Sequence, residues 1–205
     1  RFGSRTTTGD LEGDIAEHCE VPSDLGAALT AALPRFTGPL KQVPPMYSAI
    51  KQAGQPLYKL ARQGIEVPRE ARQVEIRSLV LTGIDGQDAH FELRCSKGTY
   101  VRTLAEDLAR AVGSCAHLVM LRREFAAPFE GQPLTTLAQV LDSPGTLALL
   151  PPDAALAGLA SLTLGLEGEI RLRQGQAQVV PGPSAGGLLR LYGQGGRFLG
   201  IGEAA

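Results

Sequence analysis

The stretch Cys95-Ser96-Lys97-Gly98-Thr99-Tyr100-Val101-Arg102-Thr103 lies where one sequence pattern gives way to another. Before it, apolar and polar residues alternate over 88–95, which is the period of a half-buried strand. After it, apolar residues recur at helical spacing: Val101, Leu104, Leu108 and Val112. Gly98 permits a tight turn between the two patterns, and Gly113 is placed to cap the helix at its C-terminal end. The sequence therefore predicts a strand, a turn and a helix whose first turn carries Arg102.

Arg102 is the first candidate functional residue. A guanidinium is always charged, and it can bind a carboxylate or a phosphate through two parallel hydrogen bonds. The alternative is a solvated surface arginine, and spacing alone favours that alternative.

Composition narrows the class of protein. With 205 residues, 43% of them hydrophobic and 20% charged, the chain resembles an ordinary globular protein of one or two domains. It contains no apolar run of bilayer length and no signal-peptide pattern at its start. Cys19, Cys95 and Cys115 are scattered and odd in number, which argues for a reducing compartment and against both a disulfide framework and a zinc site. The dispersed histidines likewise make a metal site unexpected.

The charges are unevenly distributed although the net charge is −1. Residues 10–24 carry six acidic side chains and no basic one, whereas residues 41–72 are predominantly basic and include Tyr47 and Tyr58. Cations interleaved with aromatic residues suit contact with RNA. A surface excursion with solvated charges explains the same pattern equally well.

The other segments predict further helices and strands, which together indicate an α+β fold. We expect a helix over 25–33 with Ser23 as N-cap and Pro34 as its end, and a hairpin of 74–84 with 88–95 around Asp85-Gly86. Residues 43–51 should be extended by their prolines and then become a strand-like piece, and a turn at 52–55 should lead to a short helix over 56–63. A strand is predicted over 116–125, and a helix from Thr135 or Thr136 to Leu141.

The C-terminal part differs in composition. Pro151-Pro152-Asp153 marks the expected domain boundary. Beyond it, a helix over 167–173 and strands over 176–180, 188–192 and 197–201 predict a small, barrel-like β-domain.

Several segments together resemble the TruB family, bacterial synthases that make pseudouridine in the T loop of transfer RNA. The matching segments occur in family order: Gly3-x-Arg5-Thr6-x-Thr8-x-Asp10-x-x-Gly13, Pro44 to Lys51, Leu57-Tyr58-x-x-Ala61-Arg62-x-Gly64, Arg69-x-x-Arg72, Cys95 to Thr103, and His117 to Arg123. The tail around Phe198 to Gly202 resembles the PUA domain that follows in this family.

The resemblance implies a fold and a domain plan. Residues 1–152 are expected to form the C-terminal portion of an α+β catalytic domain with a mixed or antiparallel sheet, and 41–72 its RNA-binding insertion. Residues 153–205 are expected to form a PUA-like β-barrel domain. The implied partner is the T arm of tRNA, with no membrane, a monomeric state and a cytoplasmic location.

The resemblance also implies the chemistry. In this family an aspartate attacks the target uridine, and the base detaches, rotates and rejoins through carbon without any metal or cofactor. Arg102 matches the arginine that keeps this nucleophile ionised, and Asp10 matches an acid that holds the arginine. Tyr100 and Leu121 match residues that border the flipped base. Further RNA-binding candidates carry charge or an aromatic ring: Lys97, Tyr47, Lys51, Tyr58, Arg62, Arg122 and Arg123.

The family's Leu-Asp-Pro segment, which carries the nucleophile, does not occur in these 205 residues. We therefore expect the catalytic aspartate to lie outside them, and the chain by itself not to catalyse. Two alternatives stay open: a non-catalytic RNA-binding module, and a subunit of a guide-RNA-dependent pseudouridine synthase. Fold-level likeness alone would not decide among them.

Overall fold

The structure is a computed structural model that describes residues 1–143, 145, 149–177 and 187–204. It divides into two compact units, Arg1–Leu121 and Arg122–Ala205. The domain boundary expected at residues 152–153 stays a prediction.

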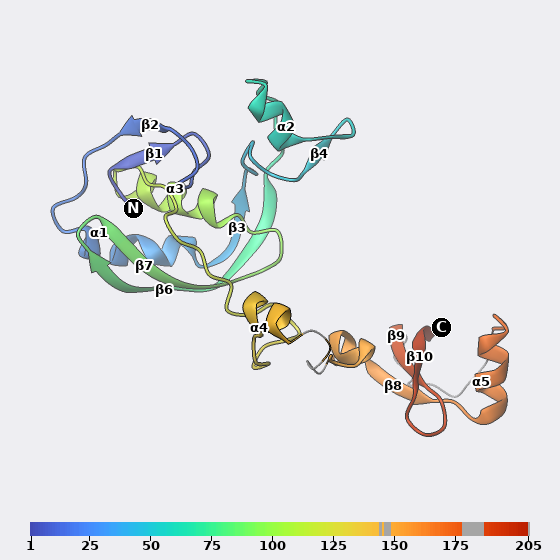
Figure 1. Ribbon diagram of the computed structural model, residues 1–205. Coiled ribbons are helices and arrows are strands. Elements are labelled where there is room, and N and C mark those ends of the chain that lie inside the picture. Colours follow the sequence, from blue (N-terminus) through green and yellow to red (C-terminus); the bar gives the residue numbers. More distant parts are fainter. Residues whose placement is uncertain (144, 146–148, 178–186, 205) are drawn as a thin grey trace. The chain divides into compact units, whose positions relative to one another are not determined.

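A three-stranded antiparallel sheet forms the framework of the first unit (Figure 1). Its strands are β3 (Gly38–Gln42), β6 (Arg72–Asp85) and β7 (Asp88–Cys95), in the order β3-β6-β7. The predicted β6–β7 hairpin is confirmed, and Gly86 in its turn has a φ of +59°. β3 was not predicted, because its first two residues, Gly38 and Pro39, are unfavourable in strands and hide its alternation.

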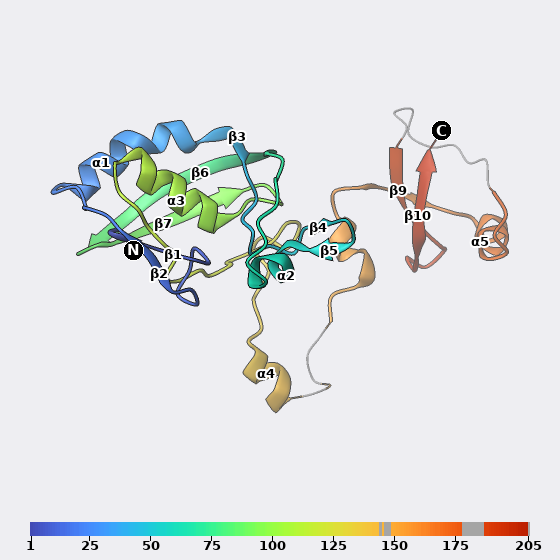
Figure 2. The ribbon, with the colours of Figure 1, turned by 90° about the horizontal axis from the view of Figure 1, so that it is seen from above.

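Helices pack on one face of this sheet (Figure 2). They are α1 (Leu25–Ala32), the 3-10 turn η1 (Leu33–Phe36) and α3 (Val101–Ala111). The core between α3 and the sheet contains Leu104 and Leu108 against Ile76 and Leu79. Because the apolar stripe of α3 is anchored on the sheet, the first turn of this helix, with Arg102, is fixed at the end of β7.

The predicted strand–turn–helix is confirmed around Arg102. Gly98 has a φ of +84°, and Gly113 ends the helix with a φ of +75° and an N–H that donates to the Arg110 carbonyl. Both conformations favour glycine because a Cβ is strained there.

The prediction for the start and end of α1 was wrong in detail. The N-cap is Asp24 and not Ser23, because the Asp24 carboxylate accepts the N–H of Ala27 at 2.9 Å. Pro34 does not end the helical segment but lies in the first turn of η1. In a first turn the backbone N–H has no partner within the helix, so a proline costs no hydrogen bond there.

A short hairpin, which the sequence did not predict, contains Thr7, Thr8 and Asp10 in the turn between its strands. Its strands are β1 (Ser4–Thr6) and β2 (Ile15–His18), paired antiparallel. The strand predicted over 116–125 was wrong: Ala116 bridges Phe2 and Leu118 bridges Asp10, each in isolation. This segment bonds to two separate stretches of chain in turn, so no continuous ladder forms, and Met120 is 82% exposed beyond it.

Residues 43–71, between β3 and β6, form a lobe that projects from the end of the sheet (Figure 1). The lobe contains the two-residue strands β4 (Lys51–Gln52) and β5 (Gln55–Pro56) and the helix α2 (Leu57–Arg62), which confirms the predicted turn and helix. Of the strand-like piece predicted within 43–51, only Lys51 lies in a strand, because residues 46–49 form a bend. Ser48 fixes this bend: its N–H donates to Met46 and its carbonyl accepts from Tyr58.

The second unit contains a three-stranded sheet. Parallel β8 (Ala160–Thr163) and antiparallel β10 (Phe198–Ala204) flank β9 (Gly187–Tyr192). Its helical elements are α4 (Leu137–Asp142), the 3-10 turn η2 (Pro152–Leu156) and α5 (Leu166–Arg173). Thr136 caps α4 as predicted, in a capping box with Gln139. Of the strand predicted over 176–180, residues 176 and 177 are not in a strand, and 178–180 lie outside the described residues.

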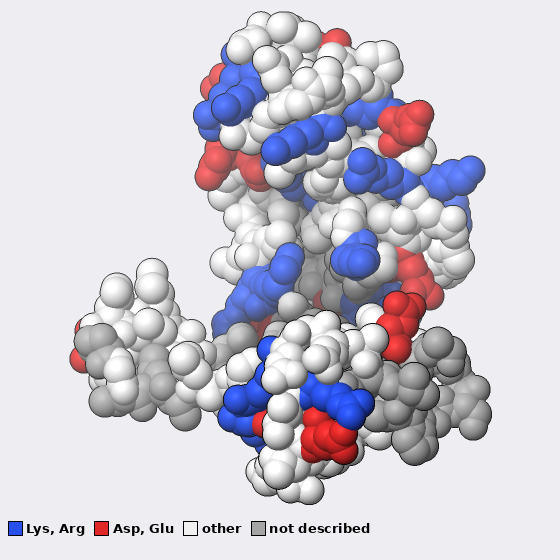
Figure 3. Space-filling view, turned by 90° about the vertical axis from the view of Figure 1, so that its right-hand side faces the viewer, with Lys and Arg blue, Asp and Glu red and all other residues white. Residues whose placement is uncertain are grey.

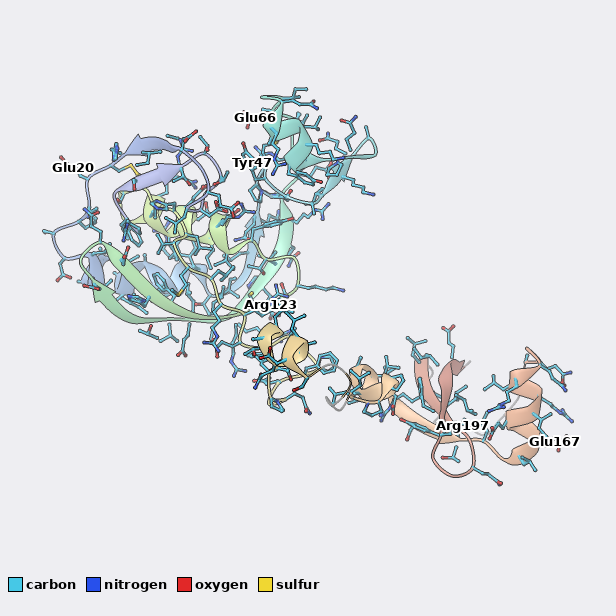
Figure 4. The ribbon with its side chains drawn as sticks, in the orientation of Figure 1. Glu20, Tyr47, Glu66, Arg123, Glu167 and Arg197 are labelled. Atoms are coloured by element: carbon cyan, nitrogen blue, oxygen red, sulfur yellow. A yellow bond between two sulfur atoms is a disulfide. The ribbon has the colours of Figure 1, made fainter. Side chains whose placement is uncertain are left out.

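Cys19 and Cys115 form a disulfide, with a Cα–Cα distance of 5.7 Å (Figure 4). The expectation that the cysteines form no disulfide was therefore wrong for this pair, and Cys95 is the free thiol. The pairing depends on Ala116 docking beside Phe2, a long-range contact that cysteine spacing does not reveal.

Reduction of this disulfide is expected to lower the melting temperature. The bridge spans 96 residues, and closing a loop of that length lowers the entropy of the unfolded chain by the equivalent of about 4.7 kcal/mol. Thermal unfolding with and without reductant measures the effect, and a Cys95→Ser variant should show the same drop. Three free thiols in the denatured, unreduced protein would contradict the bridge.

None of the helices in the described residues has the length and apolar character that a membrane crossing needs.

Candidate active site

The side chain of Arg102 lies at the meeting point of three segments of the first unit. Its Nη1 donates to the Thr8 carbonyl at 3.0 Å and to Oδ2 of Asp10 at 2.9 Å. Its Nη2 donates to the Tyr47 carbonyl at 2.7 Å. The side chain is 25% exposed. One guanidinium, carried by α3, is thus held by the β1–β2 turn and by the lobe. The sequence predicted the contact with Asp10 but not the contacts with the two carbonyls.

The turn between β1 and β2 orients Asp10. The Thr8 hydroxyl donates to Oδ1 of Asp10 at 2.5 Å, and the Glu12 N–H donates to the same atom at 3.1 Å. Gly13 lets the turn close, since a Cβ there would lie 2.5 Å from the Thr8 hydroxyl oxygen. Oδ2 of Asp10 is left to face Arg102, so the carboxylate is a positioned counter-ion.

The environment of Asp10 keeps it ionised. Partial burial favours the neutral carboxyl, but hydrogen bonds from Thr8, Glu12 and Arg102 and the charge of Arg102 outweigh it, so the pKa of Asp10 is lowered. At neutral pH the site therefore contains an Arg102–Asp10 ion pair.

Arg102 has hydrogen-bonding capacity to spare. A guanidinium has five N–H donors. Three of them bind the Thr8 carbonyl, the Asp10 carboxylate and the Tyr47 carbonyl. Within the described residues, Nε and the second N–H of Nη2 bond to no protein group. A further carboxylate or a phosphate oxygen can therefore bind without displacing Asp10.

Sequence reasoning missed Glu106, one helical turn after Arg102. Its Oε1 lies 3.0 Å from the position of a Cβ on Gly9, beneath the β1–β2 turn. Burial raises the pKa of the Glu106 carboxyl, and the nearby Arg110 opposes this shift only in part. The signal available in the sequence was the four-residue spacing from Arg102, which places both side chains on one helix face.

The predicted RNA-binding residues fall into separate places. Tyr100 is the half-buried residue directly before α3, Lys97 is exposed in the preceding turn, and Leu121 is 63% exposed. In the lobe, Tyr47 lies at the base (Figure 4), Lys51 is in β4, and the Arg62 guanidinium lies 5.7 Å from the ring centre of Tyr58.

Arg122 and Arg123 belong to the second unit, where both are exposed and Arg122 pairs with Glu124 at 3.3 Å. The structure does not bring them together with Arg102 in one unit. No cluster of His, Cys, Asp or Glu suited to a metal occurs among the described residues.

Family models match the chain in series. The TruB family pseudouridylate synthase N-terminal domain matches residues 1–101, and the tRNA pseudouridylate synthase B C-terminal domain matches 102–156. The pseudouridine synthase II TruB C-terminal model matches 160–205.

Relatives match over the whole chain. The tRNA pseudouridine synthase B of Ectopseudomonas mendocina (strain ymp) is 43% identical over 213 residues, covering 100% of this chain and 69% of the relative. The protein of the same name from Burkholderia mallei (strain NCTC 10247) is 44% identical over 216 residues, covering 100% and 70%. A chain in the crystal structure of a Cbf5-Nop10-Gar1 complex has a TM-score of 0.65 over 90% of this chain and 56% of that chain. At 23% identity, the latter likeness concerns the fold alone.

The family models and the relatives along the whole chain identify a pseudouridine synthase, and the fold is like that of the chain in the Cbf5-Nop10-Gar1 complex. The chain belongs to the TruB family.

Proposed function

We propose that this chain carries the catalytic arginine and the RNA-gripping lobe of a tRNA pseudouridine synthase that acts on the T-loop uridine. The observation that carries the proposal is Arg102, held by Thr8, Asp10 and Tyr47 with two N–H donors to spare. A cation so placed keeps an adjacent carboxylate ionised and oriented, which is what a nucleophilic aspartate requires.

The proposed reaction isomerises the uridine through an aspartate nucleophile. An aspartate outside residues 1–205 binds the spare donors of Arg102 and attacks the uridine, and the bond between the sugar and N1 breaks. The detached uracil rotates, a bond forms between the sugar and C5, the bond between the aspartate and the substrate breaks, and the hydrogen of C5 leaves as a proton while N1 gains one. Tyr100 and Leu121 border the extruded base. Neither a metal nor an organic cofactor is assigned a role.

The lobe is proposed to grip the T arm. Lysines and arginines are spread over its exposed surface (Figure 3), and they include Lys51, Lys59 and Arg62. Within the described residues these three form no salt bridge, so their charge is available to phosphates. The Tyr58–Arg62 pair adds an aromatic face and a cation side by side.

Replacing Lys51 or Arg62 by alanine is expected to weaken T-arm binding and to flatten its salt dependence. Each lost phosphate contact should reduce the slope of log K against log salt by about 0.7 to 0.9. Fluorescence anisotropy at several salt concentrations measures this. Arg77→Ala, which removes an exposed charge from β6 outside the lobe, serves as control. Slopes equal to wild type for both lobe variants would remove them from the interface.

For the second unit we propose a PUA-like domain over residues 153–205 and RNA contacts from Arg122 and Arg123. The match of residues 160–205 to the TruB C-terminal model and the three-stranded sheet support it. A cytoplasmic location is part of the proposal, because tRNA is the expected partner. A monomeric state is proposed as well.

The product on whole tRNA tests the proposed function. An unmodified tRNA transcript is incubated with a protein of the relatives' full length, and pseudouridines are mapped by carbodiimide adducts that stop reverse transcription. A single new stop in the T loop is expected. No stop, or one that requires an added guide RNA, would contradict the proposal and favour a binding module or a guide-dependent synthase.

A further inference from the structure

Gln42 is a buried polar residue that lies outside the family motifs quoted above. It is the last residue of β3, and only 3% of its surface is exposed. The alternation of β3 places it on the same side as Leu40, which packs against the core beneath α3. An amide in such a place needs partners, because burying unpaired polar atoms is costly.

The partners of Gln42 are both backbone groups of Tyr100. Oε1 of Gln42 accepts the Tyr100 N–H at 3.0 Å, and Nε2 donates to the Tyr100 carbonyl at 3.4 Å. Tyr100 directly precedes α3, and no side chain caps this helix from within its own segment. A residue 58 positions away in the sequence thus holds the start of the helix that carries Arg102.

The same strand end leads into the lobe. Five residues after Gln42, the Tyr47 carbonyl accepts from Arg102 at 2.7 Å. Pro44 and Pro45 stiffen the connection between them, and Arg69 donates to the Pro44 carbonyl at 3.1 Å from the returning side of the lobe. The end of β3 and the base of the lobe therefore hold the segment of Arg102 at two points: Gln42 binds the backbone of Tyr100, and the Tyr47 carbonyl binds the guanidinium.

We propose that Gln42 is a positioning residue of the pseudouridine synthase reaction. It fixes Tyr100, and through α3 the guanidinium of Arg102, relative to the base of the RNA-gripping lobe. This inference rests on the proposed function. Gln42 itself touches neither the uridine nor the nucleophile, so its replacement should slow the chemical step more than it weakens RNA binding.

The test compares three variants of the full-length enzyme. Gln42→Met keeps the shape and removes both hydrogen bonds. Gln42→Glu keeps an acceptor for the Tyr100 N–H and loses the donor to its carbonyl. Gln73→Met makes the same change as the first at an exposed position of β6, and Gln73 has no part in the site.

Single-turnover rates of pseudouridine formation at saturating T-arm hairpin, dissociation constants and melting temperatures are measured for each. We expect Gln42→Met to slow the single-turnover rate roughly 10- to 100-fold, the range of a lost positioning contact, with the dissociation constant within about threefold. Gln42→Glu should lose at least as much, because its second carboxylate oxygen is buried against the Tyr100 carbonyl oxygen, and Gln73→Met should match wild type.

The outcomes separate the two claims. A Gln42→Met enzyme that turns over at the wild-type rate, or one whose rate loss is matched by an equal loss of binding and of folded protein, overturns the positioning role while the synthase function stands. A wild-type enzyme that forms no pseudouridine overturns the proposed function, and this inference with it.

Discussion

Replacing Arg102 by alanine is expected to abolish turnover while the affinity for a T-arm hairpin changes by no more than a few-fold. The substitution removes the cation beside Asp10 and leaves the Thr8 and Tyr47 carbonyls without a donor. It also removes the two spare donors proposed for the nucleophile. Loss of a preorganised electrostatic group in an active site costs about 10² to 10³ in rate, and loss of a full charge should reach at least the upper end.

Single-turnover pseudouridine formation and anisotropy measure these two effects. Arg110→Ala is the matched control, because Arg110 lies on the same helix, is 67% exposed and pairs with Asp107. Arg102→Lys should restore little of the turnover rate. A lysine ammonium cannot reach the three acceptors that the planar guanidinium binds and also bind another carboxylate. An Arg102→Ala enzyme with unchanged turnover would contradict the role assigned to this residue.

Replacing Asp10 by asparagine is expected to reduce the turnover rate about 10- to 100-fold, because the amide keeps the shape but no longer draws Arg102 by charge. The Thr8 and Glu12 donors can still bind the amide oxygen, so the β1–β2 turn should persist. A purely structural Asp10 would instead lower the melting temperature and leave the rate of the folded protein unchanged.

The pH dependence gives a second readout for Asp10. Its pKa is lowered in the folded protein, so ionised Asp10 stabilises the fold above the pKa of the unfolded chain, about 3.9. This stabilisation is lost as the pH falls through the still lower folded pKa. Acid unfolding below about pH 4 should therefore be less steep for Asp10→Asn than for wild type. A stability difference that changes between pH 6 and 8 would contradict this assignment.

Local patterns predicted the part of the fold on which the site is built. The alternation over 88–95, the glycine at 98 and the helical spacing after Val101 act over neighbouring residues, so strand, turn and helix formed where expected. The strand expected over 116–125 failed for the opposite reason. Its apolar residues are present, but its backbone partners lie in two distant segments that the local pattern does not specify.

The site shows the same division. Arg102 and Asp10 were identified by the motifs that contain them. In the structure, Nη1 of Arg102 lies 2.9 Å from Oδ2 of Asp10. The Thr8 and Tyr47 carbonyls were missed, because every residue has a carbonyl and only the fold selects the one that binds. Gln42 was missed as well, because the strand that turns its side chain inward was itself not predicted.

The measurement that tests the central claim most directly is tritium release from a T-arm hairpin labelled at carbon 5 of the loop uridine. With a protein of the relatives' full length, the account predicts one tritium released per pseudouridine formed, at a rate that collapses in Arg102→Ala while hairpin binding persists. Tight binding of the hairpin by the wild-type protein without any release would contradict the account.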